Sequence, residues 1–126
     1  MKKKRAVSKE VYTLADLKDW HDVHPPIRLG VFGDPVEHSL SPQMQSAALK
    51  HYKIDMQYAR LRISPDELRE AIDLSRKLEF VGVNLTIPHK TAALQLLDVA
   101  DENVKRIGAV NVIKIGGGKL RGFNTD

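Results

Sequence analysis

The sequence predicts an α/β fold: a three-layer α/β/α domain with a mixed, mostly parallel sheet that ends in a β-hairpin. From residue 28 onward, short apolar runs typical of buried strands alternate with segments of helical periodicity, as in parallel α/β folds. Helix-start signals, in which serine or threonine precedes proline or an acidic residue, separate several of these segments. Three consecutive glycines at positions 116–118 lie between two strand-like runs and indicate a hairpin turn.

Residues 1–27 are expected to form an N-terminal extension before the domain at residues 28–126. The first 12 residues predict a loosely attached lead that begins with a basic tail. A short helix should follow, because Thr13 and Asp16 have the spacing of a capping box. Its apolar face would be formed by Leu14, Leu17 and Trp20.

The first strand and helix of the domain are predicted over residues 28–32 and from Ser41 to about Lys53. The apolar run of the strand ends at Gly33-Asp-Pro, which favours a turn. Ser41 is expected to be the N-cap residue, and Pro42 the first helical residue. The side chains available to face the core are Met44, Ala47, Ala48 and Tyr52.

The second strand and helix are predicted over residues 56–63 and from Ser64 onward. The strand alternates apolar and basic residues, so one face should be buried, formed by Ala59, Leu61 and Ile63. Ser64 and Glu67 form a second capping box, with proline at the first helical position. The helix should bury a stripe formed by Leu68, Ala71, Ile72 and Ser75.

Three further strands are predicted in the second half of the domain. The run 80–87 should end at Pro88, with one face formed by Val81, Val83, Leu85 and Ile87. A helical pattern follows at 91–97, and a short helix over 101–107 should be capped at its C-terminus by Gly108. The hairpin strands are expected at 109–115 and 119–123.

The charge of the chain is concentrated in its first residues. The chain of 126 residues has a formal net charge of +4, with 20 Lys and Arg against 16 Asp and Glu. Lys2, Lys3, Lys4 and Arg5 account for this excess, so the rest of the chain is neutral. Four cations without interleaved aromatic residues are typical of a solvated terminus, and we expect no nucleic-acid partner. Nucleic-acid binding by the tail remains an alternative, which would be strongly salt-dependent.

Other classes of protein are disfavoured by what the sequence lacks. No stretch approaches the ~18 apolar residues of a membrane span, and charged residues interrupt the region where a secretory signal would be apolar. The chain has no cysteine, which excludes disulfides and fits a cytoplasmic location. The histidines are scattered, so no metal site is predicted. The glycines at 116–118 match neither the dinucleotide-binding nor the P-loop spacing.

Polar residues interrupt the predicted third strand near its carboxyl end. Buried parallel strands are usually continuous apolar runs, yet Asn84 and Thr86 interrupt this one, and Lys90 follows within one turn. In open α/β sheets, ligands bind beyond the carboxyl ends of the strands. These residues therefore predict a small polar ligand beside one positive charge. The alternative is that Asn84 and Thr86 only bind neighbouring loop backbone.

A second polar segment lies between the first strand and its helix. Ser39 and Ser41 place two hydroxyls at a helix N-terminus, where neutral donors and the helix dipole favour a carboxylate. Simple N-capping by Ser41 is the alternative role. Asn111 interrupts a further strand, and the polar run 124–126 follows the last one. Four strand ends with polar groups indicate one shared site.

Four segments resemble, in order and approximate spacing, the signature segments of shikimate dehydrogenases. They are GDPVEHSLSP at 33–42, NLTIPHK at 84–90, GAVN at 108–111 and NTD at 124–126. The resemblance covers about residues 28–126 and implies the substrate-binding N-terminal domain of that family. Two positions depart from the family pattern: Val112 stands where threonine is usual, and Phe123 stands where a polar residue or tyrosine is common.

The resemblance implies an enzyme activity, the NADP-dependent reduction of 3-dehydroshikimate to shikimate in aromatic amino-acid biosynthesis. Lys90 and Asp126 would be the catalytic pair. A lysine ammonium suits this role, because it can stabilise the negative charge that develops on the substrate's carbonyl oxygen and donate a proton to it. Glu102 aligns with an acidic position sometimes found near the cofactor. The residues implied to bind substrate are Ser39 and Ser41 for its carboxylate, and Asn84, Thr86 and Asn111 for its ring hydroxyls.

Alternatives within and outside this family stay open. Relatives also act on quinate, although serine rather than threonine at position 41 favours shikimate. A domain that binds a small hydroxylated carboxylate without catalysis belongs to another functional class. Because the family's dinucleotide-binding domain is absent from this chain, we expect the chain by itself to bind substrate weakly and to be inactive.

Overall fold

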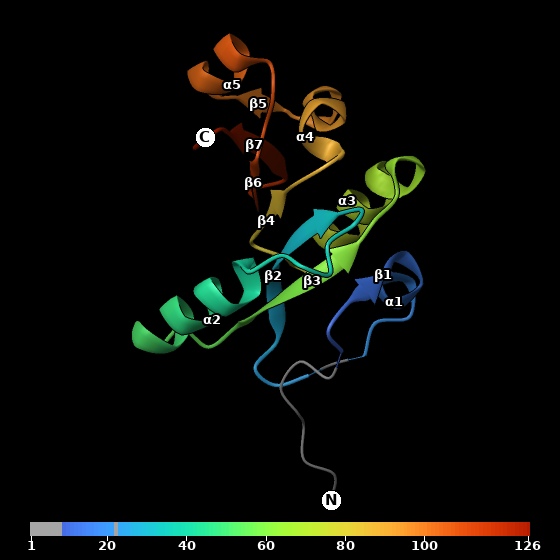
Figure 1. Ribbon diagram of the computed structural model, residues 1–126, viewed down its shortest axis with the longest axis vertical. Helices are drawn as coiled ribbons and strands as arrows, with labels where there is room; N and C mark the ends of the chain where they lie inside the picture. Colours follow the sequence, from blue (N-terminus) through green and yellow to red (C-terminus); the bar gives the residue numbers. More distant parts are fainter. Residues whose placement is uncertain (1–8, 22) are drawn as a thin grey trace, which may run out of the picture.

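The computed structural model describes residues 9–21 and 23–126, which form one seven-stranded sheet flanked by helices (Figure 1). The basic tail at residues 1–5 lies outside the described residues. The strands are β1 Tyr12–Thr13, β2 Ile27–Gly33, β3 Gln57–Arg62, β4 Gly82–Leu85, β5 Val99–Ala100, β6 Val112–Gly116 and β7 Lys119–Phe123. The α-helices are α1 Leu14–Lys18, α2 Ser41–His51, α3 Leu68–Lys77, α4 His89–Ala92 and α5 Glu102–Ile107, and the 3-10 helices are η1 Pro65–Glu67 and η2 Ala93–Leu96.

The sheet is mixed, with the strand order β1-β3-β2-β4-β6-β7-β5. Strands β1, β3, β2 and β4 run parallel, and β5 runs parallel to β7. Strand β6 pairs antiparallel with both β4 and β7, and it forms the predicted hairpin with β7. The predicted mostly parallel sheet with a C-terminal hairpin is thus confirmed. Since β6 runs opposite to β4, the residues just before β6 lie at the carboxyl end of β4.

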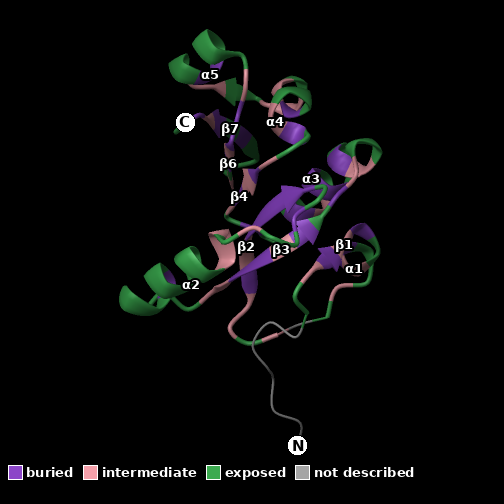
Figure 2. Cartoon of the chain, in the orientation of Figure 1, coloured by how far each residue is buried: buried purple, intermediate pink, exposed green. Residues whose placement is uncertain are grey.

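Helices cover both faces of the sheet, and an apolar cluster lies on each face. The larger cluster joins Phe32 of β2 to residues of α1 and α3, such as Leu17 and Ile72. The smaller cluster joins Val31 of β2 to Leu49 of α2. Figure 2 shows the buried residues concentrated in the central strands between these helices. Successive residues of β2 therefore point into opposite clusters, which produces the three predicted layers.

Several predicted helix signals are present in the structure. In the capping box before α1, the backbone N–H of Thr13 donates to Asp16 Oδ2 at 2.8 Å. Before α3, the backbone N–H of Ser64 donates to Glu67 Oε1 at 2.9 Å. Helix α5 ends at Gly108, whose φ of 78° is a left-handed conformation that glycine adopts without strain. The stripe of α3 is buried as predicted, with Leu68, Ala71, Ile72 and Ser75.

The N-terminal segment is attached more firmly than the sequence predicts. Tyr12 is buried and pairs, as part of β1, with Leu61 at the outer edge of β3. Its ring centroid lies 5.4 Å from that of Trp20. The prediction of a loose lead through residue 12 is therefore wrong at Tyr12, because β1 covers a strand edge that would otherwise be unpaired. The domain boundary at residue 28 stays a prediction.

The start of α2 differs by one residue from the predicted start. Its N-cap residue is Leu40, and Ser41 is the first helical residue. N-capping by Ser41 is therefore wrong. The backbone N–H of Ser41 instead donates to the hydroxyl oxygen of Ser39 at 3.2 Å. Ser39 thus satisfies one of the free N–H groups that every helix start presents.

Helix α2 also turns a different face toward the sheet. The residues expected in its core face are exposed, with Met44 at 67% and Tyr52 at 72%, together with Ala47 and Ala48. Leu49 is the buried residue of the helix. The helix lacks a strongly apolar stripe, and a polar contact also attaches its start to the sheet. Arg60 of β3 donates to the Ser39 carbonyl and to the side chain of Gln43.

Strand β4 is shorter than the predicted run 80–87. Its buried residues are Val83 and Leu85. Two flanking residues that were predicted on the same face are exposed, namely Val81 and Ile87. Beyond the strand, the backbone N–H of Thr86 still donates to the carbonyl of Phe32 of β2, at 3.0 Å. Helix α4 then begins at His89, earlier than the predicted start at Thr91.

Candidate functional site

The polar segments that were predicted to share a site meet at one edge of the sheet. The carboxyl ends of β2, β4 and β7 lie at this edge, and so does the beginning of the antiparallel strand β6. They enclose a cleft of about 250 Å³. The cleft is lined by Val31, Ser39, Ser41, Gln45, Asn84, Leu85, Thr86, Lys90, Asn111 and Asp126. The structure therefore brings together every residue that was expected to be catalytic or to bind substrate.

A lysine and an aspartate form an ion pair in this cleft. Lys90 Nζ lies 2.8 Å from Asp126 Oδ2, and the side chains are 35% and 59% exposed. Lys90 belongs to α4, which follows β4 closely, whereas Asp126 follows β7. The hydrogen bond from Lys90 is the main cause that lowers the pKa of the Asp126 carboxyl. Asp126 is therefore ionised at neutral pH.

Asn111 connects this ion pair to the end of β7. Its amide nitrogen donates to Asp126 Oδ1 at 3.1 Å and to Thr125 Oγ1 at 3.0 Å, while its amide oxygen accepts from the backbone N–H of Thr125 at 3.1 Å. Asn124 donates to the carbonyl of Ala109 at 2.9 Å and accepts from the backbone N–H of Asp126 at 2.8 Å. These polar residues hold the Asp126 carboxylate in place.

The two serines line the cleft at the N-terminus of α2. Arg60 donates from Nη2 and Nε to the carbonyl of Ser39, at 2.6 and 3.0 Å. Because the hydroxyl oxygen of Ser39 accepts from the N–H of Ser41, its hydroxyl proton is left to donate elsewhere. This end of the cleft favours a bound carboxylate. The serine hydroxyls are neutral donors, the N-terminus of α2 is the positive end of its helix dipole, and the Arg60 guanidinium lies against the Ser39 carbonyl.

Asn84 and Thr86 line the cleft from the end of β4. The hydroxyl of Tyr58, on neighbouring β3, donates to Asn84 Oδ1 at 2.6 Å. Tyr58 is 5% exposed. Burial raises the pKa of its phenol, and a hydrogen bond with Ser41 opposes this rise only in part. Tyr58 therefore keeps its proton and remains a donor.

His89 is the buried neighbour of Lys90. Its Nε2 lies 2.6 Å from the carbonyl oxygen of Ile63, so Nε2 carries a proton, because a carbonyl can only accept. Among the described residues, Nδ1 has no hydrogen-bond partner. Burial lowers the pKa of the ring, which favours its neutral form. His89 thus anchors the turn that carries Lys90 to the chain just after β3.

Three residues at the cleft were missed by reasoning from the sequence: Gln45, Tyr58 and Arg60. Gln45 lines the cleft itself, whereas Tyr58 and Arg60 hold Asn84 and Ser39. The signal that could have found Tyr58 and Arg60 is the polar face of β3, which alternates with the buried apolar face. That face lies toward α2 rather than toward solvent, because Tyr58 packs in the cluster with Leu49. Gln45 lies on α2, where no such signal marks it.

Glu102 lies outside the cleft. It is the first residue of α5, and its carboxylate lies 3.9 Å from Lys105 Nζ on the same helix. Its place near a cofactor stays a prediction. Among the described residues, no group of three or more His, Cys, Asp or Glu side chains is arranged to hold a metal ion. Within that same part of the chain, no helix has the length and apolarity needed to cross a membrane.

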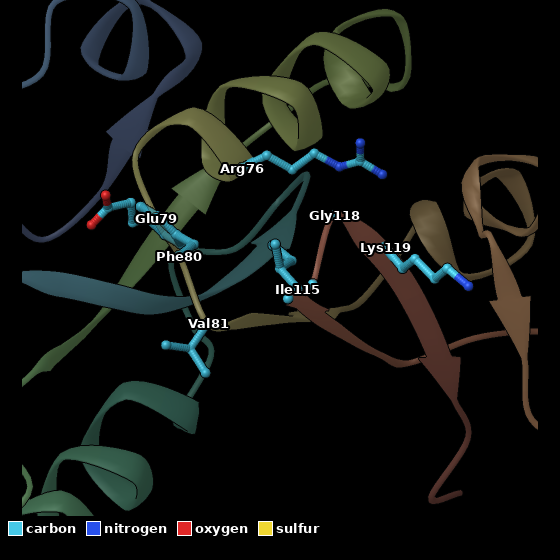
Figure 3. A pocket seen from close by; sticks show the side chains of 9 residues that line it. Arg76, Glu79, Phe80, Val81, Ile115, Gly118 and Lys119 are labelled. Atoms are coloured by element: carbon cyan, nitrogen blue, oxygen red, sulfur yellow. The ribbon is translucent and has the colours of Figure 1, made fainter.

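A second cavity, of about 350 Å³, lies at the opposite end of the hairpin (Figure 3). Gly117 and Gly118 form the turn there, with φ of 59° and 73°. The labelled Arg76 is already paired, since its Nη2 lies 3.1 Å from Asp98 Oδ2. The apolar part of the wall is formed by Phe80, Val81 and Ile115. The glycine cluster thus forms a hairpin turn, as expected, and lies far along the strands from the polar cleft.

Fold and cleft together define a class of protein: an α/β domain with a polar cleft at the carboxyl edge of its sheet, where such folds bind ligands. The family model described as the shikimate dehydrogenase substrate binding domain matches residues 31–113. The chain therefore belongs to the shikimate dehydrogenase family, which confirms the resemblance seen in the sequence.

Individual relatives agree with this assignment. The chain is 46% identical over 96 residues to a shikimate dehydrogenase (NADP(+)) of Nitrosopumilus maritimus, covering 76% of this chain and 35% of the relative. The shikimate dehydrogenase of Thermus thermophilus solved in complex with shikimate has a TM-score of 0.76 and 41% identity, over 79% of this chain and 38% of that chain.

A relative with another activity shares the fold. The 5-ketofructose reductase of Gluconobacter sp. strain CHM43 has a TM-score of 0.77 and 33% identity, over 84% of this chain and 37% of that chain. The chain thus spans little more than a third of the length of each of these proteins. It corresponds to one part of the longer relatives.

Proposed function

We propose that this chain is the half of an NADP-dependent shikimate dehydrogenase that binds substrate and carries the catalytic residues. The enzyme would reduce 3-dehydroshikimate to shikimate, in the cytoplasm, as a step of aromatic amino-acid and chorismate biosynthesis. The observation that carries this proposal is the single cleft, in which a lysine–aspartate ion pair lies with hydroxyl and amide side chains from four segments. These groups match a small ring that bears one carboxylate and several hydroxyls.

The carboxylate and the ring hydroxyls would be bound by different groups. Ser39 and Ser41 would donate to the carboxylate at the N-terminus of α2. Asn84 and Thr86 would bind ring hydroxyls from the end of β4. Asn111 donates both amide protons within the protein, so the remaining lone pair of its Oδ1 would accept from a ring hydroxyl.

Lys90 would act at the ketone oxygen of 3-dehydroshikimate. NADPH, when bound, would supply a hydride to the carbonyl carbon. The Lys90 ammonium would stabilise the negative charge that develops on the oxygen and donate its proton there, and water would restore the proton to the amine. Asp126 would hold Nζ of Lys90 in position, as in the 2.8 Å ion pair.

A further domain would hold most of the dinucleotide. In the part of the chain that the structure describes, the glycines at 116–118 join two strands of a hairpin, so they form no strand-to-helix phosphate turn. The residues present thus do not fit a dinucleotide site of that kind. Support for NADP comes from the relatives, which include a shikimate dehydrogenase solved in complex with NADP+.

Titration of the ¹⁵N-labelled 126-residue chain with shikimate, followed by NMR, tests this function. We expect shifts at Ser39, Asn84, Lys90 and Asn111 at millimolar ligand. A chain with Ser41→Ala should bind more weakly by about 5- to 20-fold, as for loss of a hydrogen bond to a charged group. Ser46→Ala, on the exposed part of α2, is the matched control.

The outcomes separate the competing functions. Absence of shifts at these residues would contradict the proposal. Stronger binding of quinate than of shikimate would assign the chain to a quinate-using enzyme instead. Specific binding of shikimate without any activity in a complete enzyme would leave a binding domain that is not catalytic.

A further inference from the structure

Tyr58 of β3 is a buried polar residue for which the proposed chemistry has no use. Its hydroxyl donates to Asn84 Oδ1 at 2.6 Å. Its ring packs with Val31, Val36 and Leu49 in the smaller apolar cluster, between the sheet and α2. A side chain held on several sides loses most of its rotamer freedom. The hydroxyl is therefore presented to Asn84 from a fixed point.

The side chain of Asn84 lies in the wall between two hollows. It lines the polar cleft, and it also lines a neighbouring groove of about 430 Å³. Tyr58 lines that groove and is not among the residues that line the cleft. Because Oδ1 is bound to Tyr58, which lines the groove, the amide nitrogen Nδ2 is the group of Asn84 that is left for a ligand in the cleft.

The orientation of the Asn84 amide follows from this hydrogen bond. The phenol of Tyr58 keeps its proton, because burial raises its pKa. Asn84 therefore presents its oxygen to the phenol, since an amide nitrogen cannot accept.

We propose that Tyr58 is a positioning residue that fixes the side-chain amide of Asn84, so that Asn84 presents only hydrogen-bond donors to a ligand in the cleft. A ring oxygen opposite Asn84 would then have to accept. The identity of that ligand as shikimate rests on the proposed function, whereas the fixed amide does not. Tyr58 would thus contribute to selectivity without touching the ligand.

The first experiment needs no ligand. In the ¹⁵N-labelled chain, the side-chain amide of Asn84 is assigned by its loss in Asn84→Ala. The order parameter of its Nδ2–H bonds is then measured by ¹⁵N relaxation in the wild type and in Tyr58→Phe, with Tyr52→Phe at the exposed end of α2 as the matched control. Because Tyr58 holds Oδ1 and with it the whole amide plane, we expect Tyr58→Phe to lower the order parameter from about 0.8 to below about 0.6, and Tyr52→Phe to change nothing. Equal order parameters in wild type and Tyr58→Phe would overturn the proposal.

The second experiment is a double-mutant cycle on shikimate affinity. Tyr58→Phe should raise Kd about 5- to 30-fold in the wild-type background and less than about 2-fold in Asn84→Ala, because it acts through Asn84. A general structural role would give the same factor in both backgrounds and would overturn the proposal. If the wild-type chain binds no shikimate, the proposed function fails, and the order parameter of the Asn84 side-chain amide still decides the role of Tyr58.

Discussion

Lys90 and Asp126 are 36 residues apart in the chain, yet their charged atoms are 2.8 Å apart. Each is positioned by a neighbouring side chain. His89 anchors the turn that carries Lys90 through its bond to the Ile63 carbonyl, and Asn111 donates to the Asp126 carboxylate. Such neighbours matter because a proton donor works only when it is held within hydrogen-bond reach of the reacting oxygen.

Replacement of Lys90 tests the acid role. In a complete enzyme that contains this domain, Lys90→Ala should lower kcat by about 10²- to 10⁴-fold, the range typical of a lost general acid, with a much smaller change in KM. Steady-state rates of NADPH oxidation measure both parameters. Lys119→Ala, at the far end of the hairpin, is the control and should leave both unchanged. Near-normal turnover of Lys90→Ala, or equal losses in kcat and affinity, would remove Lys90 from this role.

The titration of Asp126 reports the ion pair directly. Lys90 lowers the pKa of Asp126 from its ordinary value of 3.8, so the contact favours the folded chain above that pH and is lost as the pH falls through the lowered pKa. In Lys90→Met, the carboxyl pKa should rise toward 3.8, as followed by the ¹³C shift of the side chain. Lys119→Met should leave it unchanged. An identical titration in wild type and Lys90→Met would show that no such pair forms in solution.

At the scale of elements, β3 supports the cleft with side chains that do not enter it. Its apolar residues, such as Leu61, pack in the larger cluster. Its opposite face carries Tyr58 to Asn84 and Arg60 to Ser39. One strand therefore positions parts of two other segments, the end of β4 and the start of α2.

Removal of the Arg60 side chain should loosen the start of α2. Arg60→Met keeps much of the aliphatic length but loses the bonds to the Ser39 carbonyl and to Gln43. We expect faster amide exchange at Ser41 and a Kd for shikimate raised about 5- to 20-fold, as for loss of charged hydrogen bonds. Arg62→Met is the matched control, since Arg62 pairs with Glu37 instead. Equal effects of the two substitutions would contradict a specific role of Arg60.

At the scale of the whole molecule, the described residues form a polar cleft, and their glycine cluster forms a hairpin turn rather than a dinucleotide-binding turn. The chain spans 35% of its relative from Nitrosopumilus maritimus. All the residues proposed to touch substrate lie within this third. The proposed division is thus between a domain that orients the substrate and proton donor and a domain that holds the hydride donor.

This division predicts the activity of the chain alone. The 126-residue chain should bind shikimate with Kd in the millimolar range and should not oxidise NADPH in the presence of 3-dehydroshikimate. Absorbance at the reduced nicotinamide band measures turnover, with a complete relative as the positive control. Turnover by the chain alone would contradict the need for a further domain.

The elements that were predicted well are those with strong local signals. The capping boxes at Thr13 and Ser64 and the C-terminal glycine cap at Gly108 depend on residues within one or two turns. The rotation of α2 was predicted wrongly, because alanine and glutamine give it no strong apolar stripe. Its start is attached to β3 by Arg60, a residue that follows the helix in the chain. Local patterns carry no information about such a partner.

The sequence by itself determined the fold class, the family and the residue types of the cleft, because strand and helix periodicity and four ordered motifs are all local properties. Only the tertiary structure decided that Lys90 and Asp126 meet, that Ser39 rather than Ser41 satisfies the start of α2, and that Tyr58 holds Asn84. These contacts depend on which strands become neighbours and on the antiparallel direction of β6. The order of the strands depends on the packing of the whole chain, because helices from different parts of the sequence have to cover both faces of the sheet at once.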